Sequence, residues 1–200
     1  MTLFFKILKW TGIALGGAFI VLFIVRWFHI RNLDKTDAQV AKIHATKLQL
    51  SDVMGENLPP DPGAEADKTV AGIDANANGI RDDVELAIFK EYPNSAKTRA
   101  VLLQYALALQ MGTNQPIINK NTATEVVREQ SRAFVCIGEI VSREDLKKFD
   151  KETDLLTEFV RQRQLNTEER KNSRNNFIEY VGSYNSLDRT CDIDYSTLPN

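Results

Sequence analysis

A long apolar stretch near the N-terminus divides this chain into a part that fits a membrane and a part that does not. Residues 10–25 carry no charge, and basic residues flank them on both sides. As a helix, the stretch from Trp10 to Trp27 would span about 26 Å at 1.5 Å per residue. This is slightly short of a hydrocarbon core, but basic side chains can extend outward and further apolar residues precede it. We expect a transmembrane anchor over residues 10–28 after a cytoplasmic stub over residues 1–9.

A cleaved signal peptide is the alternative, because it has the same basic start and apolar run. Cleavage needs small residues just after that run, whereas Val25 to Ile30 are all bulky. We therefore favour an uncleaved anchor. Gly12 and Gly16 form a G-x-x-x-G pair that would allow a homodimer through the membrane helix, although small residues are common in such helices whatever their role.

Two cysteines indicate the compartment. Cys136 and Cys191 are the only pair, and a disulfide between them would suit an oxidising space. The alternative is two buried thiols in a reducing compartment. Positive charge is nearly balanced across the anchor and does not fix its orientation. We expect an inner (cytoplasmic) membrane protein whose C-terminal domain faces the periplasm or another extracytoplasmic space.

Composition excludes some functions. The 200 residues are 43% hydrophobic, which suffices for one domain with attachments, and the net charge of -2 gives no reason to expect a nucleic-acid partner. The two histidines, His29 and His44, have no neighbour at metal-ligand spacing, and we expect both to be solvated or interfacial. We see no catalytic motif.

The rest of the chain reads as helices around a break. Residues 29–56 predict a helical stalk, and residues 57–73 contain three prolines and a glycine in Asn57–Gly63, which mark a linker. We expect a small helical bundle over residues 74–200. No strand pattern is evident, so the predicted fold is all-α with about five helices in the bundle.

Helix boundaries follow from local signals. The first bundle helix should run from Ile80 to Tyr92, because the residue before a proline resists helical geometry. Asn94 or Ser95 should cap the next helix, which is apolar nearly all round, should be the most buried, and should stop near Gly112. Later helices are expected to start at three motifs: Thr122–Glu125, Ser142–Asp145 and Asn166–Glu169.

Oxygen-bearing side chains recur through the stretch 74–85, with a glycine that permits a sharp turn, Gly79. Ca²⁺ prefers six to eight oxygen ligands. The candidate side-chain ligands are Asp74, Asn76, Asn78, Asp82 and Glu85.

This pattern resembles the EF-hand calcium loop, over these residues only. The resemblance implies a backbone carbonyl ligand from Ile80, a direct or water-mediated ligand from Asp82, and a bidentate Glu85. The eighth position of an EF-hand loop is usually apolar, but here it holds Arg81. A long helix entering the loop is also not expected. The loop is therefore more similar to unpaired loops of the thrombospondin type 3 or dockerin kind. The alternative is an Asx-rich turn that caps a helix without metal.

These features favour a non-enzymatic, membrane-anchored calcium-binding interaction or scaffold module with an unidentified protein partner. One alternative is an envelope hydrolase, or an inhibitor or immunity protein, that uses the acidic surface near the loop. A third is a calcium sensor that exposes apolar surface when the ion binds.

Overall fold

A computed structural model describes residues 2–185 and 191–199, so residue 1 of the expected stub and residues 186–190 and 200 of the expected bundle lie outside it. The described residues form helices and connections without strands, which confirms the all-α prediction. The helices are α1 (Thr2–Ala45), α2 (Leu50–Met54), α3 (Asp82–Glu91), α4 (Ala96–Asn114), α5 (Lys120–Glu139), α6 (Leu146–Gln164) and α7 (Glu168–Glu179), with short 3-10 helices η1 (Gly63–Asp67) and η2 (Tyr195–Thr197).

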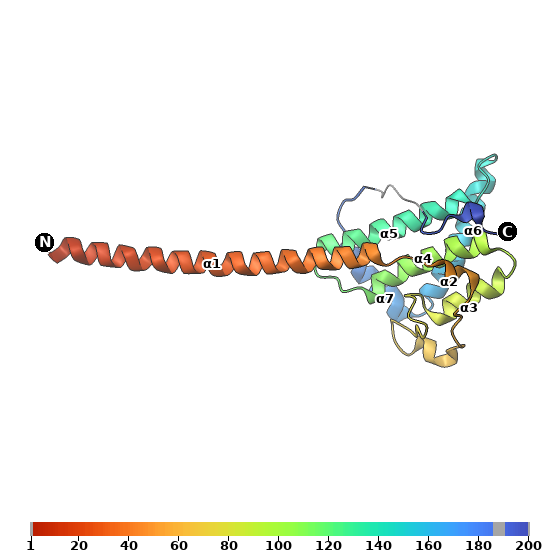
Figure 1. Ribbon diagram of the computed structural model, residues 1–200, viewed down its shortest axis with the longest axis horizontal. Helices are drawn as coiled ribbons and strands as arrows, with labels where there is room; N and C mark the ends of the chain where they lie inside the picture. Colours follow the sequence, from red (N-terminus) through yellow and green to blue (C-terminus); the bar gives the residue numbers. More distant parts are fainter. Residues whose placement is uncertain (1, 186–190, 200) are drawn as a thin grey trace.

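The first helix is one continuous rod of 44 residues that leads into the bundle at its far end (Figure 1). No glycine or proline lies between Gly17 and Gly55, so nothing in the sequence interrupts it before the bundle. Its N-terminal part reaches a mean hydropathy of 2.0 and is 0% buried. This segment is long and apolar enough to cross a membrane.

The last turns of α1 pack against the bundle instead of standing apart as a stalk. Thr36, Gln39 and Ile43 are buried. Gln39 Nε2 donates to Gln115 Oε1 at 2.9 Å, and Asn119 Nδ2 donates to Thr36 Oγ1 at 2.7 Å. The hydrophobic core therefore begins within the segment that the sequence suggested as a stalk.

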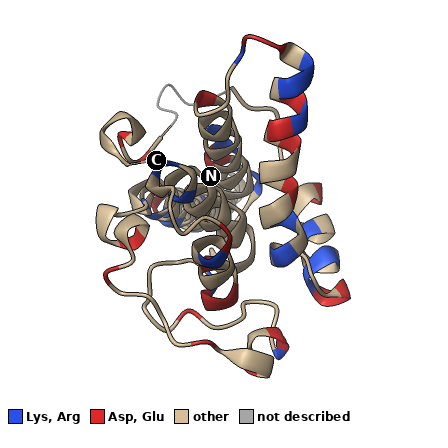
Figure 2. Ribbon diagram, turned by 90° about the vertical axis from the view of Figure 1, so that its right-hand side faces the viewer, with Lys and Arg blue, Asp and Glu red and all other residues tan. Residues whose placement is uncertain are grey.

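The apolar helix α4 is the centre of the bundle, as its composition predicted, and it packs against α2, α3, α5, α6 and α7. Ser95 caps it by accepting a hydrogen bond from the Thr98 amide at 3.1 Å, one of the two caps expected. Helix α5 covers α4 and receives the end of α1. Acidic and basic residues are interspersed over the outer helices, as is typical of solvated faces (Figure 2).

Three helices begin at caps other than those expected. The cap of α5 is Asn119, whose Oδ1 accepts from the Thr122 amide at 3.2 Å, so Thr122 lies inside the first turn. Helix α6 starts after Asp145 instead of Ser142, and α7 starts after Thr167, one residue later than expected. Asparagine, aspartate, serine and threonine all make good caps, so neighbouring candidates compete and the tertiary fit selects one.

A disulfide joins Cys136 of α5 to Cys191 in the C-terminal segment, with Cα atoms 5.3 Å apart, as predicted. It holds that segment against the bundle, and η2 then packs on α4. Crosslinks of this kind persist in oxidising compartments.

The linker before the loop is held by one arginine. Arg170 of α7 is 2% exposed, and its guanidinium donates to the carbonyls of Ala66, Thr69 and Val70 and pairs with Asp67. The planar arginine guanidinium carries five N–H donors, so it can donate hydrogen bonds to several carbonyls at once.

Replacing Arg170 by methionine should destabilise the fold by about 3 kcal/mol, because charge-assisted hydrogen bonds contribute roughly 1.5–3 kcal/mol each and the freed carbonyls regain water. Urea unfolding would measure the loss, and limited proteolysis should cut within residues 63–72. Lys171→Met is the matched control, because Lys171 is exposed and pairs with Glu168 of its own helix. An equal effect of both variants would contradict this role.

Candidate calcium loop and buried charge cluster

The turn at residues 74–79 is organised by its first carboxylate. Asp74 Oδ1 accepts from the Asn78 amide at 3.1 Å, and Oδ2 accepts from the Gly79 amide at 2.9 Å. Asn78 Oδ1 accepts from the Ile80 amide at 2.9 Å. Asp74, Asn76 and Asn78 are half-buried, so their oxygens line the inside of the turn region without being fully covered.

Gly79 is required at the sixth position of the loop. Its φ of +86° lies in the left-handed region, and a Cβ there would stand 2.7 Å from Leu107 Cδ1 of α4. Both constraints exclude a side chain. The loop therefore packs directly on the central helix.

Two acids that follow the turn, in the first turn of α3, are buried. Asp82 is 0% exposed and Glu85 is 1% exposed. Asp82 accepts from the Ala75 amide at 3.0 and 3.2 Å, and Glu85 Oε2 accepts from Asn76 Nδ2 at 3.1 Å. Burial raises the pKa of Glu85 to about 7 and also raises the pKa of Asp82. A buried carboxylate without a positive partner is costly.

The one nearby guanidinium does not neutralise these acids. Arg81 is 0% exposed, but it pairs with Asp83 and donates to the Gln164 carbonyl at 3.2 Å. No ion pair of Asp82 or Glu85 occurs among the described residues. In the described part of the chain, the fold thus buries these two carboxyl groups without giving either an ion-pair partner.

The amides in the loop complete the arrangement. Asn76 Nδ2 donates to both Glu85 and the Asn57 carbonyl, at 3.1 and 3.0 Å. Asn78 Nδ2 is buried without a partner in hydrogen-bonding geometry, although the Asn78 side chain lies near enough to Glu85 to lower its pKa. A buried amide nitrogen without a full partner is rare in a satisfied core.

In the described part of the chain, no three His, Cys, Asp or Glu side chains come together as a metal cluster. Hollows of about 410, 500 and 510 Å³ lie along α5, α6 and the segments beside them, and none of these three is lined by a residue of the 74–85 stretch.

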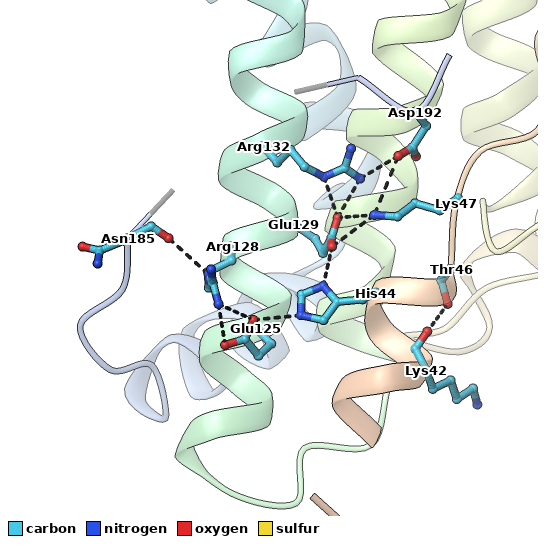
Figure 3. Close-up of polar contacts among 10 residues, drawn as sticks. All are labelled: Lys42, His44, Thr46, Lys47, Glu125, Arg128, Glu129, Arg132, Asn185 and Asp192. Atoms are coloured by element: carbon cyan, nitrogen blue, oxygen red, sulfur yellow. Dashed lines mark hydrogen bonds and ion pairs between the residues drawn. The ribbon is translucent and has the colours of Figure 1, made fainter. Parts of the chain in front are cut away.

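A second buried cluster lies where α1 meets α5 (Figure 3). His44 Nδ1 lies 2.8 Å from Glu129 Oε1, and His44 Nε2 lies 3.0 Å from Glu125 Oε2. His44 is therefore only partly solvated: its side chain is 34% exposed, but it lies between two acids of α5 that the sequence did not identify.

Basic residues surround those acids. Arg128 pairs with Glu125 at 2.9 Å, while Arg132 and Lys47 both pair with Glu129, at 2.6 and 3.0 Å. Figure 3 shows how they approach the carboxylates from α5 and from the connection after α1. Glu125 is thus occupied by ion pairs and does not close a capping box with Thr122.

The C-terminal segment joins the same cluster. Asp192 pairs with Arg132 at 2.8 Å and accepts from the Leu48 amide at 3.0 Å. Because Asp192 directly follows Cys191, the disulfide holds this carboxylate next to Arg132 and the Leu48 amide. The local signals for the cluster were the spacing of Glu125 and Glu129 on one helix face and the arginines three residues after each, but they did not identify His44, Lys47 or Asp192 as partners.

No protein-family model, curated protein or solved structure matches this chain.

Proposed function

We propose that the chain is a membrane-anchored, extracytoplasmic interaction module whose 74–85 loop binds one calcium ion. The observation that carries the proposal is the pair of fully buried carboxylates, Asp82 and Glu85, without a protein cation beside half-buried Asp74, Asn76 and Asn78. A hard divalent cation would supply the missing positive charge and accept these oxygens as ligands.

The donor set fits such an ion. Asp74, Asp82 and Glu85 offer carboxylate oxygens, and Ile80 offers its carbonyl. The Asn76 nitrogen points at Glu85, and Asn78 Nδ2 is buried near it. Turning the Asn76 amide by half a turn exchanges its nitrogen for its oxygen, so the side chain that donates to Glu85 would become a ligand of a cation.

The ion would act as a structural staple. The loop connects to the linker through the Asn57 carbonyl and to α4 through the contact between Gly79 and Leu107. Calcium would therefore fix the entry segment on the bundle. A sensor would instead need a partner loop and a groove that opens.

The distance between the 74–85 loop and the three hollows supports an interaction role over a catalytic one. A hydrolase that used the ion would need an open coordination position beside a cleft, whereas the hollows described above lie away from the loop. An unidentified protein partner is the occupant that we propose for the bundle surface. The inhibitor or immunity role belongs to the same class.

The placement outside the cytoplasm is supported by the apolar part of α1 and by the disulfide. We propose the inner membrane as the site of the anchor. A Cβ on Gly12 or Gly16 would meet no other described part of the chain within 4 Å beyond the adjacent helix backbone, so a second copy of α1 would find them open.

Calcium at about 100 times its Kd should stabilise the full-length protein in nanodiscs by about 2.7 kcal/mol, since the ion binds the folded loop alone. This corresponds to a rise in Tm of roughly 5–10 °C. Calorimetric titration and thermal unfolding, each with calcium and with chelator, would measure both effects. Glu85→Gln should abolish the response.

The matched control is Glu91→Gln, because Glu91 ends the same helix and is exposed. It should respond to calcium like the parent chain. If the parent chain shows neither heat nor a change of Tm, the loop is an Asx-rich turn without metal and the proposal fails.

A further inference from the structure

His44 stands at the junction between the membrane-directed helix and the bundle. It lies in the last turn of α1, and both of its ring nitrogens contact acids of α5, Glu129 at 2.8 Å and Glu125 at 3.0 Å (Figure 3). These two contacts tie the end of α1 to the bundle at a partly exposed position. Protons from solvent can reach it.

The chemistry of the two contacts depends on protonation. An ionised carboxylate only accepts hydrogen bonds, and a neutral imidazole has one N–H. Both contacts are therefore satisfied only when both ring nitrogens carry a proton. In the neutral form, one nitrogen lone pair would face the oxygen of a carboxylate.

The other charged groups of the junction contact the carboxylates and not the ring. Arg128 and Arg132 come from α5, Lys47 from the connection after α1, and Asp192 from the C-terminal segment. On α1 itself, Lys42 is exposed. The three cations oppose the protonation of His44, while the three acids Glu125, Glu129 and Asp192 favour it.

Glu129, one of the two carboxylates that contact the ring, stays ionised over the pH range in which histidines ordinarily change charge. Burial favours the neutral form of Glu129, yet hydrogen bonds from His44, Arg132 and Lys47 and the Arg132 charge hold its pKa below the usual range. Histidine ordinarily changes charge between about pH 5 and 8.

We infer that His44 is a proton-operated latch that docks the end of α1 on α5 when its imidazole is charged and loosens it when the imidazole is neutral. The sign follows from the contacts: docking is tight at the acidic end of the interval and weakens as the pH rises. Ile43 is 0% exposed in the core, so we expect the last turns of α1 to loosen without leaving the bundle.

Ring ¹⁵N chemical shifts of the full-length protein in nanodiscs, recorded from pH 5 to pH 8.5, would test the protonation directly. His29→Gln removes the only other histidine and assigns the signal. We expect the imidazolium pattern at low pH and one neutral tautomer at high pH. A neutral pattern across the whole range would overturn the inference.

Hydrogen exchange would test the mechanical consequence. The protection of the amides of residues 40–45, corrected for intrinsic exchange rates and compared with α5 amides, should fall about tenfold from pH 5.5 to pH 8. A change of this size corresponds to the loss of roughly one charge-assisted hydrogen bond. His44→Lys keeps a permanent charge and should stay protected at both values. His44→Gln cannot be charged and should be poorly protected at both.

The control for exchange is His29→Gln, because His29 is exposed on the membrane side of α1 and should leave the pH dependence unchanged. If His44→Gln retains the pH dependence of the parent chain, the latch is absent. Should that variant unfold, the parent spectra and His44→Lys still decide the question.

Discussion

Removing the Cys136–Cys191 disulfide should lower the free energy of unfolding by about 4 kcal/mol. The bond closes a loop across a sequence separation of 55, and the chain-entropy model gives a loss of this size. The C-terminal segment would also lose its fixed position, and Asp192 would then pair less often with Arg132. Urea unfolding of Cys136→Ala/Cys191→Ala against the parent chain would measure the loss.

Reductant supplies the control for this prediction. The parent chain should lose stability in reductant at equilibrium, while the double alanine variant should show no response. Cys136 is 1% exposed, so reduction will be slow and equilibration must be verified. A loss below about 1 kcal/mol would mean that the tail is held by its ion pairs and not by the crosslink.

Replacing Glu129 by glutamine should cost about 3–5 kcal/mol, the range for breaking a buried ion pair from one side. Glu129 is 1% exposed and binds His44, Lys47 and Arg132 at once. Arg132 is 5% exposed and pairs with Asp192 as well, so the variant would leave this buried guanidinium without the Glu129 charge. Urea unfolding at pH 7 would measure the loss.

Glu139→Gln is the matched control. Glu139 ends the same helix and pairs with Arg143 at 2.9 Å, but both side chains are partly or largely exposed. Exposed pairs contribute about 0–1 kcal/mol. If the two glutamine variants cost the same, the buried cluster does not stabilise the junction as we argue.

The pH dependence of the Glu129 variant has a definite sign. The folded state lowers the pKa of this carboxyl, so the stabilisation is complete above the ordinary glutamate range and is lost as the pH falls through the lowered pKa. The parent chain should therefore lose more stability than Glu129→Gln when the pH drops below about 4.3. Equal acid sensitivity of the two proteins would contradict this contribution.

Sequence patterns predicted the helices better than their junctions. Apolar periodicity and the Tyr92–Pro93 step were enough for α3 and α4, because these signals are local. The caps of α5 and α6 were missed because Asn119 competes with Thr122, and Asp145 with Ser142, and only packing selects between them. A short-range pattern cannot make that choice.

The charge cluster was missed for a different reason. His44 is separated from Glu125 and Glu129 by 81 and 85 residues, so no local motif connects them. The loop at residues 74–85 is the opposite case: its oxygen-bearing residues lie close together in the sequence, and the structure places the Asp74 turn beside the buried acids. Calcium binding there is still a prediction.

The unbroken α1 has a geometric consequence for where this protein can act. From Phe28 to Thr36, the first residue buried against the bundle, the helix rises about 12 Å. A bilayer that held the apolar part would fix the bundle at about that height above its surface. The protein could then meet only molecules that come within a few nanometres of the lipid headgroups, and a partner deeper in the compartment would have to be long enough to reach it.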